Sequence, residues 1–273
     1  MFIHPTAIVS CDLVAGENVY IGPYCTVGRN VVFGDNVVLL SHVIVHDRVS
    51  IGSGSIVYPF ATIGLAPQDM KYCGEESFVE IGRKVQVREH VTIHSGTKRG
   101  IMKTTIGDGC LLMVASHVAH DCVVGEGVIM ANNATLGGHV SVGDKAIIGG
   151  LAAIHQFVRI GAYAIVAGTA GVADDVIPFG SVIGSRAKIA GLNIIGLKRN
   201  GFSRDEIHAL RKAFRALFVD SIVGSARDKV VMLSEELRSF KTVSLLCDFV
   251  GQDSSRSFCA VRNKMMTEDI GEI

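Results

Sequence analysis

An apolar residue stands at every sixth position along most of the first 172 residues, and this period limits the possible folds more than any other feature of the sequence. The first series is Ile3, Val9, Ala15, Ile21, Val27, Phe33, Leu39, Val45, Ile51, Val57 and Ile63. A second series resumes in a shifted phase: Ile106, Leu112, Val118, Val124, Met130, Leu136, Val142, Ile148, Ile154, Ile160, Val166 and Val172. With 48% apolar residues, twelve in succession have a chance probability on the order of 10⁻⁴, so the period is a structural repeat.

The neighbours of each apolar position are small or form turns. Glycine often follows it, as at Gly22 and Gly28, and glycine allows the positive φ or the tight backbone that a turn needs. Two positions before it stands a small or β-branched residue, such as Val31 or Ala134, which suits a narrow interior. One short strand and one turn per six residues, with three such units per 18-residue coil, predict a triangular parallel β-helix. Neither helical nor alternating-strand spacing explains the period.

Two interruptions of the repeat predict loops that project from the β-helix. The sixth positions between Ile63 and Ile81 hold acidic residues, so we expect a loop at about 65–78. A spacing of 13 instead of 12 residues in the next part of the series predicts a second loop at about 95–104. Loops on a rigid scaffold commonly carry binding groups.

The repeat gives way to helical spacing near the C-terminal end. Ser203 and Glu206 form a Ser-x-x-Glu capping box. Apolar residues at helical spacing follow it: Ile207, Leu210, Phe214, Leu217 and Phe218. We therefore expect a mainly β protein, with the β-helix over residues 1–186 and a small α-helical C-terminal domain over residues 187–273.

Composition argues against several classes of function. The net charge is zero, so no overall field attracts nucleic acid or anionic lipid. The chain starts without the basic and apolar segments of a signal peptide, and it has no stretch of about 18 apolar residues. The seven cysteines lack a Cys-x-x-Cys motif, which indicates free thiols in a reducing compartment. We expect a cytoplasmic protein that neither spans a membrane nor binds nucleic acid.

A histidine pair marks a candidate site. His117 and His120 flank the core-facing Val118, so both are expected on the outside of the coil. Residues 18 apart stack in columns, about 4.8 Å per coil, which places Gly138 and then Gln156 next to His120. The glycine should leave a notch between the imidazole and the amide. A notch on a flat face predicts a site that a neighbouring subunit covers.

Metal binding is the alternative use of such histidines. Carbonic anhydrases built on the same repeat hold zinc with three histidines, two of them separated by four residues. The spacings of His42 and His46 and of His117 and His120 do not match that pattern. We therefore expect no metal and no cofactor, with a zinc-dependent hydratase as the alternative reading.

Several short motifs occur in a distinctive order between residues 4 and 218. They are His4-Pro5-Thr6-Ala7-Ile8, Gln68-Asp69-Met70-Lys71-Tyr72, His117 to Cys122, Ala131-Asn132-Asn133-Ala134-Thr135-Leu136, Gly138-His139-Val140, His155-Gln156-Phe157, Asn193 and Gly196-Leu197-Lys198-Arg199. As a set they resemble the UDP-N-acetylglucosamine O-acyltransferases of lipid A biosynthesis, a family of hexapeptide-repeat enzymes. The resemblance implies a left-handed β-helix, a homotrimer, and transfer of a (R)-3-hydroxyacyl group from acyl carrier protein to the 3-hydroxyl of UDP-N-acetylglucosamine. The handedness comes only from the resemblance, because parallel crossovers are right-handed in about 98% of cases.

The resemblance also implies roles for single residues. His120 matches the general base, a task that suits a neutral imidazole, and Asp121 stands beside it. A backbone N–H near Gly138 suits an oxyanion. The family usually has a second arginine where this chain has Asn200, so this chain does not match one of the family's nucleotide contacts. The substrate-binding positions implied are Gln68, Asp69, Lys71, His117, Gly138, His139, His155, Gln156, Asn193 and Arg199.

Two further features of the sequence concern the acyl donor. Gly150 and Gly168 lie one coil apart, and the resemblance implies that they line the acyl-chain groove, so we expect a donor about as long as 3-hydroxymyristate. Residues 82–104 carry a local excess of five positive charges, which could steer the acidic carrier protein. A UDP-sugar with a 3-amino group remains an alternative acceptor.

Overall fold

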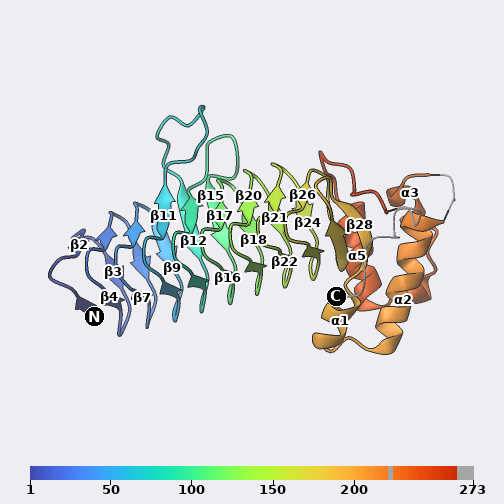
Figure 1. Cartoon of the computed structure of the whole chain (residues 1–273), viewed down its shortest axis with the longest axis horizontal. Coiled ribbons are helices and arrows are strands. Elements are labelled where there is room, and N and C mark those ends of the chain that lie inside the picture. The colour runs from blue at the N-terminus through green and yellow to red at the C-terminus, as the bar shows by residue number, and fades with distance from the viewer. Residues whose placement is uncertain (221–223, 263–273) are drawn as a thin grey trace.

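The computed structural model describes residues 1–220 and 224–262. The chain forms a long stack of triangular coils, with a group of helices at the C-terminal end (Figure 1). Three sheets form the sides of the triangle. Sheet A holds β1 (Phe2–Ile3), β4 (Tyr20–Ile21), β7 (Val38–Leu39), β10 (Ile56–Val57), β13 (Gln86–Val87), β16 (Leu111–Leu112), β19 (Ile129–Met130), β22 (Ile147–Ile148), β25 (Ile165–Val166), β27 (Gly180–Ile183) and β28 (Lys188–Leu192).

The other two sides are built in the same way. Sheet B holds β2 (Ile8–Val9), β5 (Thr26–Val27), β8 (Ile44–Val45), β11 (Thr62–Leu65), β14 (Thr92–His94), β17 (His117–Val118), β20 (Thr135–Leu136), β23 (Ala153–Ile154) and β26 (Gly171–Val172). Sheet C holds β3 (Val14–Ala15), β6 (Val32–Phe33), β9 (Val49–Ile51), β12 (Phe78–Ile81), β15 (Lys103–Ile106), β18 (Val123–Val124), β21 (Ser141–Val142) and β24 (Arg159–Ile160). Except for β27 and β28, sheet neighbours pair in parallel one coil apart, as Ile129 pairs with Ile147, so the 18-residue coil is confirmed.

The sixth-position residues form the core of the β-helix. From Ile21 to Val172 the members of both series are at most 3% exposed. Ile3 is 38% exposed, because the first coil has a neighbour on one side only.

The glycines that follow the core residues serve close packing between coils. A side chain at Gly22 would collide with the backbone carbonyl of Leu40 in the next coil. The residue with positive φ in this turn is not Gly22 but Tyr24, two residues later (57°). The glycine is therefore needed for the close approach of the backbones and not for a positive φ.

Both projecting loops leave the β-helix at the corner between sheets B and C. Residues 66–77 connect β11 to β12, residues 95–102 connect β14 to β15, and the two loops rise side by side (Figure 1). The backbone N–H of Lys98 donates to the carboxylate of Glu75 at 2.8 Å, which joins the loops directly.

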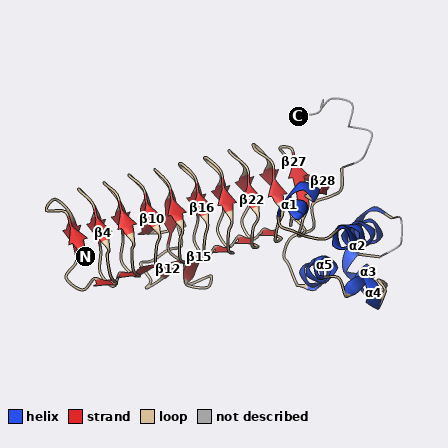
Figure 2. Cartoon of the chain, turned by 90° about the horizontal axis from the view of Figure 1, so that it is seen from below, coloured by secondary structure: helices blue, strands red, loops and turns tan. Residues whose placement is uncertain are grey.

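The β-helix ends in an antiparallel hairpin of β27 and β28. The boundary expected at 186/187 lies in the turn of this hairpin, and β28 still belongs to sheet A. Figure 2 shows α1 against this end and the other helices beyond it. The helical elements are α1 (Ile194–Arg199), α2 (Arg204–Phe214), the π-helical turn η1 (Arg215–Val219), α3 (Ala226–Val230), α4 (Glu235–Arg238) and α5 (Lys241–Gly251). Among the described residues, no helix is long and apolar enough to cross a membrane.

Only one of the two hydrogen bonds of the capping box predicted at α2 is present. The hydroxyl of Ser203 accepts a hydrogen bond from the N–H of Glu206, as expected. The carboxylate of Glu206 instead accepts from the N–H groups of Lys241 and Thr242 at 3.1 and 2.9 Å. Tertiary packing decides this, because the N-cap of α5, Phe240, has no side-chain acceptor for these groups.

Candidate active site

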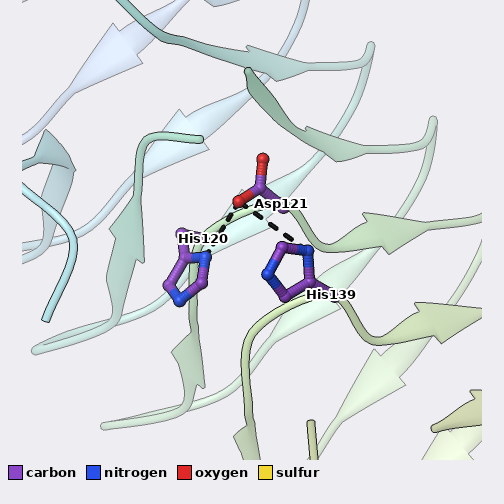
Figure 3. Close-up of side chains that lie close together, drawn as sticks. All are labelled: His120, Asp121 and His139. Carbon is purple, nitrogen blue, oxygen red and sulfur yellow. Dashed lines mark hydrogen bonds and ion pairs between the residues drawn. The ribbon is translucent and has the colours of Figure 1, made fainter. Parts of the chain in front are cut away.

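His120 and Asp121 lie in the turn between β17 and β18, at the corner from which the loops project. His139 occupies the matching turn of the next coil (Figure 3). Asp121, His139 and Phe157 all have positive φ, between 59° and 65°, so this column of turns places their side chains in succession. The ring of His139 stacks on Phe157 at 4.4 Å and meets the ring of His120 edge-on at 4.9 Å.

The centre of the site is a buried histidine–aspartate pair. Nδ1 of His120 lies 2.9 Å from a carboxylate oxygen of Asp121 (Figure 3). The side chain of His120 is 8% exposed, and the side chain of Asp121 is fully buried. An ionised carboxylate only accepts hydrogen bonds, so the ring donates from Nδ1 and keeps Nε2 as a free acceptor. This is the tautomer that a general base requires.

The second loop fixes the carboxylate of Asp121. The hydroxyl of Thr97 donates to it at 2.6 Å, and the N–H groups of Thr97 and Ile101 donate at 3.1 and 2.9 Å. Gly100 lies so close to the carboxylate that no side chain would fit there. Burial alone would raise the pKa of Asp121, but the hydrogen bonds from Thr97 and His120 outweigh it and hold the pKa below its ordinary value. The carboxylate is therefore ionised at neutral pH.

The surroundings of His120 differ from expectation in two ways. The histidine lies outside the apolar core, as expected, but it is buried and not exposed: it bonds to Asp121, which the second loop holds. Gly138 was expected to leave an open notch, but the imidazole itself occupies that space, since a side chain at Gly138 would collide with the ring.

Neutral imidazoles surround the pair. Nδ1 of His117 lies 2.6 Å from the hydroxyl of Thr92, and its ring meets His94 edge-on at 4.9 Å. Burial lowers the pKa of His117 and of His139, and burial with the neighbouring histidines lowers the pKa of His94 to about 4. His94 was missed because column arithmetic assumes 18 residues per coil, whereas this coil spans 25, from Ile93 to Val118.

The same residues are the ones that could hold a metal ion. Among the described residues, ligand atoms of His120, Asp121 and His139 lie within 4.8 Å of one another. The carboxylate already accepts hydrogen bonds from Thr97, Ile101 and His120, and a metal would have to displace some of them. The donor set therefore fits a base with its orienting carboxylate better than it fits a zinc centre.

The first loop brings polar groups above this corner. Gln68 and Lys71 are exposed, and Asp69 accepts a hydrogen bond from the N–H of Lys71 at 3.0 Å. The charge of Asp69 lies close enough to His139 to raise the pKa of that imidazole, although burial lowers it more. The loop and the histidines thus share one surface.

His155 and Gln156 follow in the next coil, on the turn after β23. Both side chains are exposed. Arg256, from the end of the described chain, donates to Nδ1 of His155 at 2.6 Å and to the carbonyl of Gln156 at 2.8 Å. No sequence signal pointed to Arg256.

Asn193 and Arg199 lie on the opposite side of the triangle. They line a cavity of about 600 Å³ over sheet A, together with Lys145 and Tyr163. The amide of Asn193 is used within the chain: it accepts from the N–H of Gly196 and donates to the carbonyl of Tyr163, both at 2.8 Å. One chain therefore does not bring these residues to His120.

Gly150 and Gly168 lie at the third corner, between sheets A and B. A Cβ at Gly168 would approach only the backbone of Gly150, with the carbonyl oxygen at 3.2 Å and the nitrogen at 3.9 Å. Between this corner and His155, the outer face of sheet B carries the small residues Ala153 and Gly171, which line a cavity of about 670 Å³.

The coil repeat and the site together define a hexapeptide-repeat transferase, and the family model "Bacterial transferase hexapeptide (six repeats)" matches residues 103–138. A second model, "Udp N-acetylglucosamine O-acyltransferase; Domain 2", matches residues 175–259. The acyl-[acyl-carrier-protein]–UDP-N-acetylglucosamine O-acyltransferase of Thermodesulfovibrio yellowstonii is 47% identical over 258 residues, which cover 94% of this chain and 98% of that protein. The chain belongs to the UDP-N-acetylglucosamine O-acyltransferase family, and it is an acyltransferase.

Solved structures agree with this assignment. The UDP-N-acetylglucosamine O-acyltransferase of Moraxella catarrhalis is 39% identical with a TM-score of 0.89, covering 94% of this chain and 99% of that chain. The UDP-N-acetylglucosamine acyltransferase of Francisella novicida is 31% identical with a TM-score of 0.91, covering 99% and 100%. The left-handed parallel β-helix with a helical C-terminal part is confirmed as the fold class.

Proposed function

We propose that the chain transfers a (R)-3-hydroxyacyl group from acyl carrier protein to the 3-hydroxyl of UDP-N-acetylglucosamine, the first step of lipid A biosynthesis, in the cytoplasm. The observation that carries the proposal is the buried pair of His120 and Asp121, 2.9 Å apart, which leaves Nε2 of the imidazole as an acceptor. The name of the Thermodesulfovibrio relative supports the donor and the acceptor. The seven free thiols fit a reducing compartment.

The chemistry follows from the geometry of the pair. Nε2 of His120 takes the proton of the sugar hydroxyl while the hydroxyl oxygen attacks the thioester carbonyl. Asp121 stays ionised and stabilises the imidazolium. Gly137 and His139 use their N–H groups within the coils, whereas within the described chain the N–H of Gly138 has no acceptor, so it can serve the oxyanion. Collapse of the intermediate breaks the C–S bond, and the imidazolium returns the proton to the leaving thiolate.

Loop residues supply the contacts to the nucleotide sugar in this proposal. Lys71 pairs with the diphosphate, and Gln68, Asp69 and His117 bond to sugar hydroxyls. Lys98 and Arg99 are exposed on the second loop, next to the site, where they can meet the acidic carrier protein.

The active assembly is proposed to be a homotrimer with sites between subunits. His120 and Arg199 lie on opposite sides of one chain, so a neighbouring copy has to bring them together. The outer face of sheet A is also apolar, which suits burial against a second copy. Its half-buried members are Val38, Ile56, Leu111, Ile129, Ile147 and Ile165.

A transfer assay with purified chain tests the proposal. Hydroxyacyl carrier proteins of graded length are offered with UDP-N-acetylglucosamine or with its 3-amino analogue, and we expect O-acylation with a long donor. His120→Ala should lower kcat by about 10²- to 10⁴-fold. His208→Ala, on the exposed face of α2, is the control and should retain activity. Near-normal turnover of His120→Ala would reassign the base.

The proximity of His120, Asp121 and His139 leaves one further question, whether a zinc ion takes part in the reaction. Metal analysis and dialysis against a chelator test this. We expect acyl transfer to persist after chelation, and transfer that is lost with the removal of stoichiometric zinc would show a metal-dependent reaction.

A further inference from the structure

The last described stretch of the chain, residues 254–262, turns back from the helices to the end of the β-helix, and we call it the return segment (Figure 1). Its backbone forms two parallel bridges, Phe258 with Asp175 and Val261 with Ile189. These bridges hold the segment in a fixed register against the last coils.

Arg256 of the return segment contacts the turn after β23. Its Nη2 lies 2.6 Å from Nδ1 of His155 and 2.8 Å from the carbonyl oxygen of Gln156, and its Nε lies 3.2 Å from the same oxygen. A guanidinium has no acceptor, so the arginine donates in all three contacts. Nδ1 of His155 therefore carries no proton, and the proton of the neutral ring sits on Nε2.

Without Arg256 the same turn would favour the other tautomer. Nδ1 of His155 lies 3.3 Å from the carbonyl oxygen of Gln156, and that contact is a hydrogen bond only if Nδ1 carries the proton. The guanidinium of Arg256 donates to this carbonyl oxygen and also to Nδ1, so Nδ1 accepts a hydrogen bond where it would otherwise donate one. The exposed ring of His155 is thereby presented with an Nε2–H donor.

We propose that Arg256 is a positioning residue for the acceptor site: it fixes His155 as the Nε2–H tautomer and holds the turn of Gln156. The proposal rests on the proposed function and on the resemblance, which implies that His155 and Gln156 are substrate-binding positions. His155 also lines the cavity over sheet B with Arg186 and Lys188, so a displaced ring would disturb the surface that faces the substrates.

Kinetics of variants test this role. Arg256→Ala should raise the KM for UDP-N-acetylglucosamine by up to about 100-fold and change kcat much less, because the ring is misplaced while the base is intact. Arg256→Lys should recover part of the loss, since one ammonium donates to either partner but does not form the same fork. Arg211→Ala, which removes an exposed arginine from α2, is the matched control. In a His155→Ala background, Arg256→Ala should add little if it acts through the ring.

A spectroscopic readout separates this proposal from the proposed function. The ¹⁵N shifts of the His155 imidazole, assigned with His155→Gln, should show Nδ1 unprotonated in the wild type and protonated in Arg256→Ala; if Arg256→Ala does not fold, Arg256→Lys takes its place and should show a mixture. A protonated Nδ1 in the wild type, or fully additive kinetic effects, would overturn the role of Arg256. A wild type without transferase activity would refute the proposed function and leave the tautomer result to decide this one.

Discussion

The carboxylate of Asp121 is held by the second loop as much as by the β-helix. Its oxygens accept from Thr97, Ile101 and His120, and its own N–H donates to the hydroxyl of Thr104 at 2.9 Å. The proposed base, His120, and its partner Asp121 thus depend on a loop that lies outside the repeat. A substitution in that loop should affect both catalysis and stability.

Thr97→Val removes the hydroxyl that donates to Asp121 at 2.6 Å and keeps the shape of the side chain. A hydrogen bond to a charged group contributes about 1.5–3 kcal/mol, so we expect a loss of that order in the free energy of unfolding at pH 7, together with a lower kcat. Thermal unfolding and the transfer assay measure the two effects. Thr135→Val, at an exposed threonine of sheet B, is the control and should change neither.

The stability effect of Thr97→Val should depend on pH in one direction. The pKa of Asp121 is lowered in the folded protein, so its ionised form stabilises the fold above the ordinary carboxyl pKa of 3.8. This stabilisation is lost as the pH falls through the lowered pKa. The difference between variant and wild type should therefore be largest near neutral pH and shrink below pH 3.8. A difference that stays constant across this range would show that Asp121 is not its source.

Among the elements, α2 caps the start of α5 through one carboxylate. Glu206 in the first turn of α2 accepts from the N–H groups that begin α5 and from the hydroxyl of Thr242 at 2.6 Å. The helical domain is therefore stabilised by a cap that one helix supplies to another.

Glu206→Ala should destabilise the protein more than Ser203→Ala does. Loss of a side-chain cap costs about 1 kcal/mol, which is what we expect for Ser203, whereas Glu206 serves three donors at the start of α5. Chemical denaturation of both variants gives the comparison. Equal losses would mean that the cap of α5 contributes little.

We propose that the corner that carries Gly150 and Gly168 sets the length of the acyl donor. Each buried methylene contributes about 0.8 kcal/mol, so an open groove should favour a long donor strongly. Gly168→Met fills that space and should turn the preference toward shorter donors by steric exclusion. The ratio of kcat/KM across donors of graded length measures this, and an unchanged length profile would place the groove elsewhere. Arg186 lines the cavity on sheet B and is a second residue to test as a limit on chain length.

At the scale of the whole molecule, mixed trimers test directly whether two subunits share one active site. His120→Ala and Arg199→Ala should each be inactive or weak alone, yet mixed trimers of the two should recover part of the activity, because some sites then combine an intact His120 with an intact Arg199. Sedimentation should show three chains of 29.0 kDa in one particle. A stable monomer at micromolar concentration, or no recovery in the mixture, would contradict the site between subunits.

The period of six was sufficient to predict the β-helix, its 18-residue coil and its core, because one repeated pattern of burial admits few arrangements. Residues exactly one coil apart were also placed correctly relative to each other, as for His120 beside Gly138 and for His139 beside Asp121. Handedness did not follow from the period, and came from the resemblance alone.

Contacts that depend on distant segments were decided only by the tertiary structure. The loop that lengthens one coil to 25 residues brings His94 to His117 and binds Asp121, the partner of His120, and no fixed period describes such an excursion. The return segment places Arg256 on His155, about a hundred residues away in the chain. The sequence determined the scaffold, because in a regular repeat the spacing along the chain fixes which residues are neighbours in space. The surroundings of the candidate base depend instead on loops and on the C-terminal stretch, whose positions follow from packing and not from spacing.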